Sequence, residues 1–280
     1  MRALILGAGG QVGRALAAAL PDATALTRAE FDIADPADLD WPAFDVVVNA
    51  GAFTDVDGAE TADGRAAAWR ANATGPGALA AVARRQRGIL VHLSSEYVFD
   101  GTADRPYVEE DPVAPLSAYG ASKAAGDLVV QSVERHYLLR PTWVVGEGRN
   151  FVRTMLALAG RGISPTVVDD QIGRPTFAPD LAAAIVHLVT TQAPFGTYHV
   201  TGGGEPASWA EVARETYALA GHADLTVTGT TTAAYFADRP AAAKRPLNSV
   251  LDTAKAEAAG VDLPDWRARL AEYVGSSQTA

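Results

Sequence analysis

The 280-residue sequence contains no cysteine, which excludes disulfides, thiolate metal sites and cysteine nucleophiles. Positive charge is also scarce, because 23 Lys and Arg residues stand against 33 Asp and Glu residues and give a formal net charge of −10. A nucleic-acid partner needs a basic surface that neutralises its phosphates, so this charge balance argues against one. A small anionic substrate stays compatible with the sequence, since a few arginines can make one cleft locally positive.

No apolar run approaches the roughly 20 residues of a membrane span, so we expect no membrane partner. The N-terminus runs directly into a glycine loop and leaves no room for a signal peptide, which predicts a cytoplasmic protein. Histidine is sparse and lacks metal-ligand spacing, which predicts no catalytic metal; the histidines are His92, His136, His187, His199 and His222.

The first half of the chain alternates short apolar runs with helical patterns. Apolar runs at 3–6, 23–26, 45–50 and 89–95 stop at glycine or hydroxyl residues, as buried parallel strands do. Residues 11–20 and 65–85 have helical patterns, the second interrupted at Gly75-Pro76-Gly77. This alternation predicts an α/β fold, a Rossmann-type doubly wound parallel sheet. Ligands of such sheets bind beyond the carboxyl ends of the strands.

A glycine loop, Gly7-Ala8-Gly9-Gly10-Gln11-Val12-Gly13, follows the first of these strands. Gly7, Gly10 and Gly13 fit a GxxGxxG pattern, because valine stands where the third glycine of GxGxxG would be. Such a loop turns tightly, lets the backbone approach phosphate and opens a helix whose N-terminus favours anions. It predicts a dinucleotide site that includes Gly9, Gln11 and Val12. The alternative is a glycine-rich turn without a ligand, which its position after the strand disfavours.

The tip of the second strand, Leu26-Thr27-Arg28, bears on which nicotinamide cofactor binds. A carboxylate there would bind the ribose hydroxyls and repel a 2′-phosphate. The tip carries Arg28 instead, which favours NADPH, whereas the nearby Glu30 keeps NADH open. The alternative interpretation of Arg28 is a solvated surface charge.

Tyr119-Gly120-Ala121-Ser122-Lys123 places a phenol and an ammonium one helical turn apart. The ordinary pKa of tyrosine, about 10, is too high for ready proton exchange at neutral pH. We expect the Lys123 ammonium to lower the pKa of Tyr119, which then protonates a carbonyl oxygen while a nicotinamide delivers hydride. Ser95 or Ser94, at the end of the preceding strand, would polarise the carbonyl. A tyrosine and a lysine at this spacing on a solvated helix are common, but the glycine loop favours a catalytic site.

Two domains follow from this pattern. Residues 1–140 are predicted to form the NAD(P)-binding domain and residues 141–280 mainly a smaller substrate-binding lobe with helices near 151–159, 178–191 and 208–220. We expect part of 165–192, the strand 166–168 and the helix after it, to rejoin the first sheet.

Almost the whole chain, in order, resembles the extended short-chain dehydrogenase/reductases and, among them, the dTDP-4-dehydrorhamnose reductase family. Besides the glycine loop and Tyr119–Lys123, the resemblance lies in 48–57, Ser94–Gly101, Pro112–Pro115 and Arg140–Trp143. The segments 170–176 and 245–251 are the most diagnostic, and Leu263–Trp266 also fits.

The resemblance implies roles for further residues. In the cofactor site, Asp32 and Ile33 would contact adenine, Ala50, Gly51 and Ala52 the pyrophosphate region, and Asn72, Ser94, Pro141 and Thr142 the nicotinamide end. The resemblance also implies a set of substrate-binding residues. They are Thr54, Val56, Glu96, Trp143, Asn150, Gln171, Arg245 and Asn248, with Ser95 beside the carbonyl. Arg245 would pair with the nucleotide diphosphate, because a guanidinium binds phosphate bidentately; a surface salt bridge is its alternative, as a core tryptophan is for Trp143.

The implied reaction is NADPH-dependent reduction, with NADH possible, of the C4 ketone of dTDP-4-dehydro-β-L-rhamnose to dTDP-L-rhamnose, with Tyr119 as general acid. The implied partner is a dTDP-linked 4-keto-6-deoxysugar, and the implied assembly is a monomer or homodimer. Two alternatives stay open: a sibling 4-ketoreductase of a secondary-metabolite deoxysugar, and a non-catalytic subunit similar to the regulatory β subunit of methionine adenosyltransferase.

The sequence departs from the family at two places. Ser95-Glu96 stands where the family usually has threonine-aspartate, which keeps the hydroxyl but lengthens the acid. Arg14-Ala15 occupies the region where some members carry a glutamate that binds magnesium between subunits, so no metal is carried over.

Overall fold

A six-stranded parallel sheet forms the centre of the molecule in the computed structural model, which describes residues 1–36 and 41–278. The strand order is β10-β5-β4-β3-β1-β2. The strands are β1 (Ala3–Leu6), β2 (Thr24–Leu26), β3 (Val46–Asn49), β4 (Ile89–Leu93), β5 (His136–Arg140) and β10 (Gly196–His199). The predicted Rossmann-type doubly wound sheet is therefore confirmed, and its order reverses between β1 and β3, where such folds bind their ligands.

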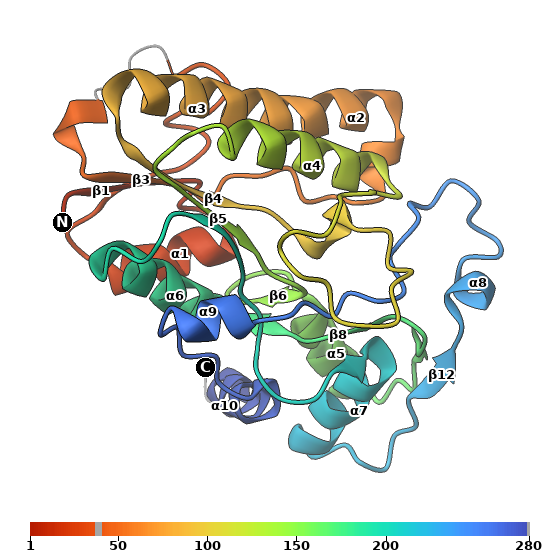
Figure 1. The fold of residues 1–280 in the computed structure, drawn as a ribbon. Helices are drawn as coiled ribbons and strands as arrows, with labels where there is room; N and C mark the ends of the chain where they lie inside the picture. The colour runs from red at the N-terminus through yellow and green to blue at the C-terminus, as the bar shows by residue number, and fades with distance from the viewer. Residues whose placement is uncertain (37–40, 279–280) are drawn as a thin grey trace.

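Helices cover both faces of the sheet because successive strand residues point to opposite sides (Figure 1). Ile5 packs in one core with Leu16 and Leu181, whereas Leu4 packs in the other with Leu79 and Val130. The first face carries α1 (Gln11–Ala19) and α6 (Ala178–Thr190). The second carries α2 (Ala62–Trp69), α3 (Gly75–Gln86) and α4 (Ala118–Val130).

The predicted interruption at Gly75-Pro76-Gly77 is wrong. Helix α2 passes through the π-helical turn η3 (Arg70–Thr74) directly into α3, whose first turn contains Pro76. Proline is tolerated there because an N–H in the first turn of a helix lacks an intrahelical partner. In the described part of this half there are also three short 3₁₀ turns, η1 (Trp41–Ala43), η2 (Gly58–Glu60) and η4 (Glu96–Val98).

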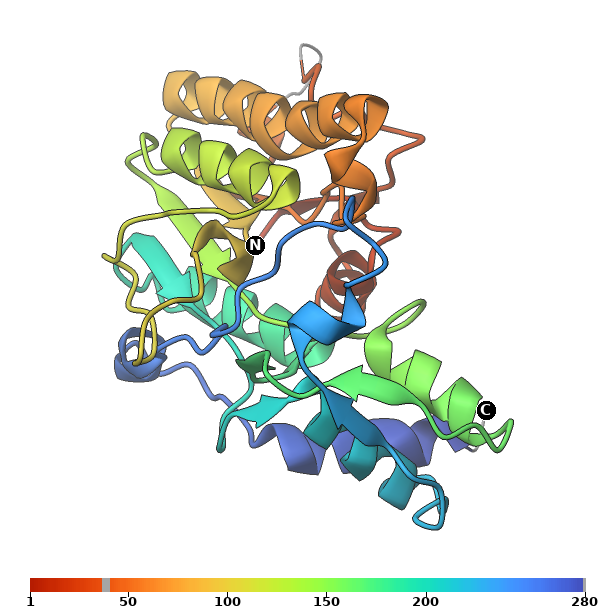
Figure 2. The same cartoon turned by 90° about the vertical axis from the view of Figure 1, so that its right-hand side faces the viewer.

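The second half of the chain adds short strand pairs and helices below the carboxyl ends of the sheet (Figures 1 and 2). The pairs are β6 (Val144–Val145) with β9 (Thr176–Phe177), β7 (Thr166–Val168) with β12 (Thr228–Thr230), and β8 (Ile172–Gly173) with β11 (Ala207–Ser208). The helices are α5 (Phe151–Ala159), α7 (Trp209–Leu219), α8 (Thr232–Tyr235), α9 (Ala254–Ala258) and α10 (Trp266–Gln278). Val152, Val212 and Trp266 share a core between α5, α7 and α10.

The expectation that strand 166–168 rejoins the main sheet is wrong, because it is β7 and pairs with β12. The helix after it, α6, does lie against α1, since Leu16 packs with Leu181 and Ile185. The sixth strand of the sheet is β10, which the sequence analysis did not place there. The boundary at residue 140 between two domains stays a prediction. Within the described parts of the chain, no helix combines the length and the apolar character needed to cross a membrane.

Candidate active site

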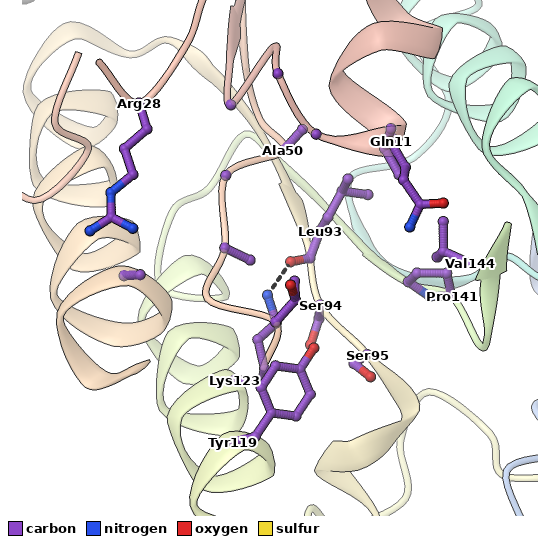
Figure 3. A pocket seen from close by; sticks show the side chains of 18 of the residues that line it. Gln11, Arg28, Ala50, Leu93, Ser94, Ser95, Tyr119, Lys123, Pro141 and Val144 are labelled. Carbon is purple, nitrogen blue, oxygen red and sulfur yellow. Dashed lines mark hydrogen bonds between the residues drawn. The ribbon is translucent and has the colours of Figure 1, made fainter. Parts of the chain in front are cut away.

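A cavity of about 770 Å³ opens at the carboxyl ends of β1, β3, β4 and β5 and reaches into the second half of the chain (Figure 3). It brings together most of the residues that the sequence analysis singled out. These are Gly7, Gly9, Gly10, Gln11, Val12, Arg28, Asp32, Ile33, Ala50, Gly51, Ala52, Thr54, Val56, Ser94, Ser95, Glu96, Tyr119, Lys123, Pro141 and Trp143.

The glycine loop is shaped by close backbone approach. Gly7 has a φ of +82°, and a Cβ there would lie 2.4 Å from the Gly51 nitrogen. A Cβ on Gly13 would lie 2.2 Å from the Gly7 carbonyl oxygen, so Gly13 lets α1 pack on the loop and does not itself line the cavity. The N-cap of α1, Gly10, lines the cavity and has no side-chain capping bond. Free N–H groups in the first helical turn favour an anion, so this cradle fits a dinucleotide pyrophosphate.

Arg28 and Glu30, which follow β2, have different surroundings: Arg28 lines the cavity, whereas Glu30 is bound to Thr27. Arg28 lies at one end of the cavity and Val144 at the other (Figure 3). The Glu30 carboxylate accepts hydrogen bonds from the Thr27 nitrogen at 2.9 Å and the Thr27 hydroxyl at 2.8 Å. These bonds lower the pKa of Glu30 and tie its charge to the strand tip. Asp32, beside Arg28 in the cavity, pairs with Arg70.

Tyr119 and Lys123 project from the first turns of α4, which Ser117 caps by accepting from the Gly120 N–H. Lys123 is 1% exposed, and its Nζ donates to the Leu93 carbonyl oxygen at 2.5 Å (Figure 3). Burial lowers the pKa of Lys123 to about 8. The Tyr119 ring meets the Tyr97 ring edge-on at a centroid distance of 5.4 Å and lies beside Ser94 and Ser95.

The prediction that Lys123 lowers the pKa of Tyr119 is wrong for this structure. Burial raises the pKa of Tyr119, and the charge of Glu96 raises it further. Burial removes the water that would solvate a phenolate, and this desolvation is the largest cause of the raised pKa. Tyr119 therefore keeps its proton at neutral pH, which suits a proton donor.

Ser95 and Glu96 follow β4 directly and form a close pair. The Ser95 hydroxyl donates to Glu96 Oε2 at 2.6 Å and accepts from the Tyr97 N–H at 3.3 Å, which caps η4. Glu96 is 3% exposed, and burial raises its pKa to about 7. A carboxyl group that exchanges its proton near neutrality thus lies next to the predicted catalytic hydroxyl.

The wall facing these groups is aromatic and comes from the second half of the chain. Trp143, which follows β5, stacks on Trp209 of α7 with ring centroids 3.8 Å apart and planes inclined by 18°. Trp143 also adopts a φ of +45°, uncommon for a residue with a bulky side chain. Both indoles line the cavity, as Thr54 and Val56 do from the opposite half.

Asn72 and Asn150 do not line the cavity but support its walls. Asn72 is fully buried in η3, where it donates to the Phe53 carbonyl oxygen and the Ser122 hydroxyl and accepts from the Phe53 N–H. Asn150 caps α5 and donates to the Gly146 carbonyl oxygen at 2.7 Å. Each asparagine therefore holds in place a segment whose adjacent residue, Ala71 or Arg149, lines the cavity.

Gln171, Arg245 and Asn248 are likewise outside the lining and hold loops together. The Gln171 amide donates to the Thr232 hydroxyl, and Asn248 donates to the carbonyl oxygens of Ala103 and Arg105. Arg245 forms an ion pair with Asp57 at 2.8 Å. Their predicted contacts with substrate stay predictions.

Some lining residues were missed by the sequence analysis. They are Arg14, Phe31, Ala67, Arg70, Ala71, Leu93, Tyr97, Val144, Glu147, Arg149 and Trp209. Tyr97 and Val144 could have been found as neighbours of predicted residues. Nothing local marks Trp209, whose place depends on how α7 packs. Among the described residues, no three His, Asp or Glu side chains gather as a metal site would require.

Comparison with known proteins agrees with this geometry. The family model described as "RmlD substrate binding domain" matches residues 1–279. The dTDP-4-dehydrorhamnose reductase of Burkholderia thailandensis is 41% identical over 292 residues, which cover 95% of this chain and 96% of that protein. A protein of Streptomyces antibioticus named as a probable dTDP-4,6-dihydroxy-2-methyloxan-3-one 4-ketoreductase is 39% identical, covering 97% and 94% of the two chains.

Solved structures show the same likeness. The crystal structure of a dTDP-4-dehydrorhamnose reductase from Clostridium acetobutylicum superposes with a TM-score of 0.91 at 35% identity and covers 99% of this chain and 100% of that one. The enzyme of that name from Bacillus anthracis, crystallised in complex with NADP, has a TM-score of 0.85 at 32% identity and covers 97% and 96%. The match along the whole chain, in sequence and in structure, shows that this protein belongs to the RmlD substrate binding domain family, that of the dTDP-4-dehydrorhamnose reductases.

Proposed function

We propose that this protein reduces the C4 ketone of dTDP-4-dehydro-β-L-rhamnose to dTDP-L-rhamnose with NADPH. The observation that carries the proposal is one cavity that holds both the glycine cradle and the group Tyr119, Lys123 and Ser95. The relative from Burkholderia thailandensis and the structures from Clostridium acetobutylicum and Bacillus anthracis carry the name of this activity.

NADPH, when bound, supplies the hydride that adds to C4 of the sugar. Tyr119, held in its protonated form by burial, donates the proton to the ketone oxygen. Ser95, beside it at the end of β4, donates a hydrogen bond to the same oxygen and stabilises the charge that develops there. Lys123, fixed by the Leu93 carbonyl oxygen, orients the nicotinamide end of the cofactor and supplies positive charge near the phenol.

The preference for NADPH rests on Arg28. Its guanidinium lines the cavity where a 2′-phosphate on the adenosine ribose would lie, and guanidinium pairs well with phosphate. The competing carboxylate of Glu30 is occupied by Thr27. NADP bound to the Bacillus anthracis relative supports the same choice.

The sugar would lie against Trp143 and Trp209, with Thr54 and Val56 on the other side. A 6-deoxysugar carries a methyl group and an apolar C–H face, which an indole covers well. Asn150, Gln171, Arg245 and Asn248 would shape this end through the loops they hold. The dTDP moiety, a monomeric or homodimeric assembly and the cytoplasmic location complete the proposal as predictions from the sequence.

A sibling 4-ketoreductase activity is the second candidate, because the Streptomyces antibioticus relative carries such a name at 39% identity. Glu96, longer than the aspartate usual in the family, lies in the cavity wall and favours a different fit around the sugar. A purely regulatory subunit is disfavoured, since it has no need for Tyr119, Lys123 and Ser95 in one cavity.

The test follows NADPH absorbance while the protein is mixed with dTDP-4-dehydro-L-rhamnose generated in situ, with NADH in a parallel reaction and chromatographic identification of the sugar product. Rapid consumption of NADPH with dTDP-rhamnose as product is expected. Binding of NADPH without turnover would overturn the rhamnose assignment. Turnover of another dTDP-4-ketosugar at a higher kcat/KM would favour the second candidate.

A further inference from the structure

The proton of the Ser95 hydroxyl is directed at a carboxyl group. Ser95 Oγ lies 2.6 Å from Glu96 Oε2, and both side chains line the cavity although they are only 7% and 3% exposed. A serine hydroxyl has one proton to donate and two lone pairs that accept. An ionised carboxylate can only accept, so it takes the single proton of Ser95. With Glu96 ionised, Ser95 therefore has no proton left for a substrate oxygen.

Protonation of Glu96 reverses this hydrogen bond. A carboxylic acid has an O–H that can donate to Ser95 Oγ across the same 2.6 Å. Ser95 Oγ also accepts from the Tyr97 N–H at 3.3 Å, so both of its lone pairs are then used. The proton of Ser95 becomes free to point away from both partners and into the cavity, where the Tyr119 phenol lies beside Ser95 (Figure 3).

We propose that Glu96 is a positioning residue that acts through Ser95: its protonated form frees the Ser95 hydroxyl to donate to the ketone oxygen, and its ionised form withdraws that donor. The inference rests on the proposed function, because it requires a ketone oxygen beside Ser95 and Tyr119. In the reduction, Tyr119 gives its proton to the oxygen, hydride from NADPH adds to carbon, and Ser95 and Glu96 keep their protons.

The surroundings of Glu96 keep both of its forms accessible near neutral pH. Burial raises the pKa of Glu96 to about 7. Tyr97 on the same turn and Tyr119 on α4 interact with its charge, and the charges of Arg245 and Asp57 act on Tyr97 in turn. Lys123 on α4 and Glu147 and Arg149 after β6 line the same cavity. No cation forms an ion pair with Glu96 within the described residues, so a modest change of pH changes its charge.

The kinetic test measures kcat and KM between pH 6 and 9 for the wild type and for the variants E96Q, S95A and E110Q. We expect kcat of the wild type to fall by up to about tenfold per pH unit above pH 7 toward the value of S95A, because only the protonated fraction of Glu96 frees Ser95. In E96Q an amide N–H replaces the acid O–H as donor, so the fall above pH 7 should disappear. S95A should have a lower kcat without that fall. Glu110 is exposed and outside the cavity, so E110Q should follow the wild type.

The same fall in E96Q or in S95A as in the wild type would overturn the inference. Glu96 could affect kcat through Ser95 or through Tyr119, whose pKa its charge also raises. S95A distinguishes the two, because an effect of Glu96 through Tyr119 alone would persist without the Ser95 hydroxyl.

A second measurement needs no turnover and distinguishes this inference from the proposed function. Infrared difference spectroscopy of the protein follows the carbonyl stretch of protonated carboxyl groups from pH 5 to 9. We expect a band that titrates near pH 7 in the wild type, is missing in E96Q, and shifts in S95A because the acid loses its acceptor. Absence of that band at pH 5 to 6 would overturn the role of Glu96 even if the ketone is reduced. A titrating band in a protein that leaves the ketosugar unchanged would instead count against the proposed function.

Discussion

Trp143 and Trp209 stack face to face with ring centroids 3.8 Å apart, although 65 residues stand between them in the sequence. Phe151 also packs against Trp209, at a centroid distance of 4.5 Å and an interplanar angle of 55°. The pair thus joins the segment after β5 to the first residue of α7 and forms a wall of the cavity. Both segments belong to the second half of the chain, so the packing of that half decides the shape of this wall.

Truncation of this wall should weaken binding of the sugar nucleotide. We expect W209A to raise KM for the dTDP-ketosugar about fivefold, because loss of an aromatic contact costs on the order of 1 kcal/mol. KM for NADPH should change much less, since the glycine cradle lies elsewhere. W69A is the matched control, because Trp69 is 43% exposed and outside the cavity. Equal increases in the two KM values for W209A would contradict a role in the sugar site.

Arg28 should decide between the two nicotinamide cofactors. R28A removes the guanidinium from the cavity rim, and we expect KM for NADPH to rise about tenfold or more while KM for NADH changes little. Steady-state kinetics with each cofactor checks this, and R85A on the exposed surface of α3 serves as control. If R28A weakens the two cofactors alike, Arg28 does not read the 2′-phosphate.

Removal of the Tyr119 hydroxyl should stop proton transfer but spare the cofactor site. Y119F is expected to lower kcat at least about 10²-fold, because general acid catalysis contributes that much. The Kd of NADPH, measured by fluorescence titration, should stay within about twofold of the wild type. Y235F, at an exposed tyrosine of α8, provides the comparison. Substantial turnover by Y119F would show that another group donates the proton.

The ionisation of Glu96 should also appear in the pH dependence of stability. The pKa of Glu96 is raised from an ordinary 4.5 to about 7 in the folded chain, so the native state binds more protons than the unfolded state between these values. The free energy of unfolding therefore falls as pH rises from 4.5 to 7. Relative to E96Q, the wild type should lose about 3 kcal/mol across this window. Urea denaturation of both proteins at several pH values tests this, and parallel curves would mean that Glu96 titrates normally.

The buried ion pair of Asp127 and Arg140 should be sensitive to loss of either partner. Arg140 Nε lies 3.0 Å from Asp127 Oδ2, and the side chains are 2% and 1% exposed. We expect D127L or R140L to lower the free energy of unfolding by about 3–5 kcal/mol, because each leaves a buried charge unpaired. The double variant should lose less than the sum of the single losses. Additive losses in urea denaturation would show that the two groups do not stabilise each other.

The sequence by itself determined the parts of this protein that depend on local spacing. The glycines at 7, 10 and 13 allow a tight turn into a helix, and on a helix Tyr119 and Lys123, four residues apart, share one face. Apolar runs that stop at Gly7, Asn49, Ser94 and Pro141 bring these residues to one edge of a parallel sheet. The fold class was therefore predictable, and so was the meeting of the glycine loop with Tyr119 and Lys123 in one cavity.

The tertiary structure alone decided whatever depends on distant segments and on burial. It placed β10 at the sheet edge and Trp209 on Trp143, and it paired Arg245 with Asp57. It also raised the pKa of Tyr119, which the sequence predicted to be lowered, because desolvation depends on every atom packed around a group. Spacing along the chain fixes which side chains can meet, whereas their charge states follow from how much water the whole fold excludes.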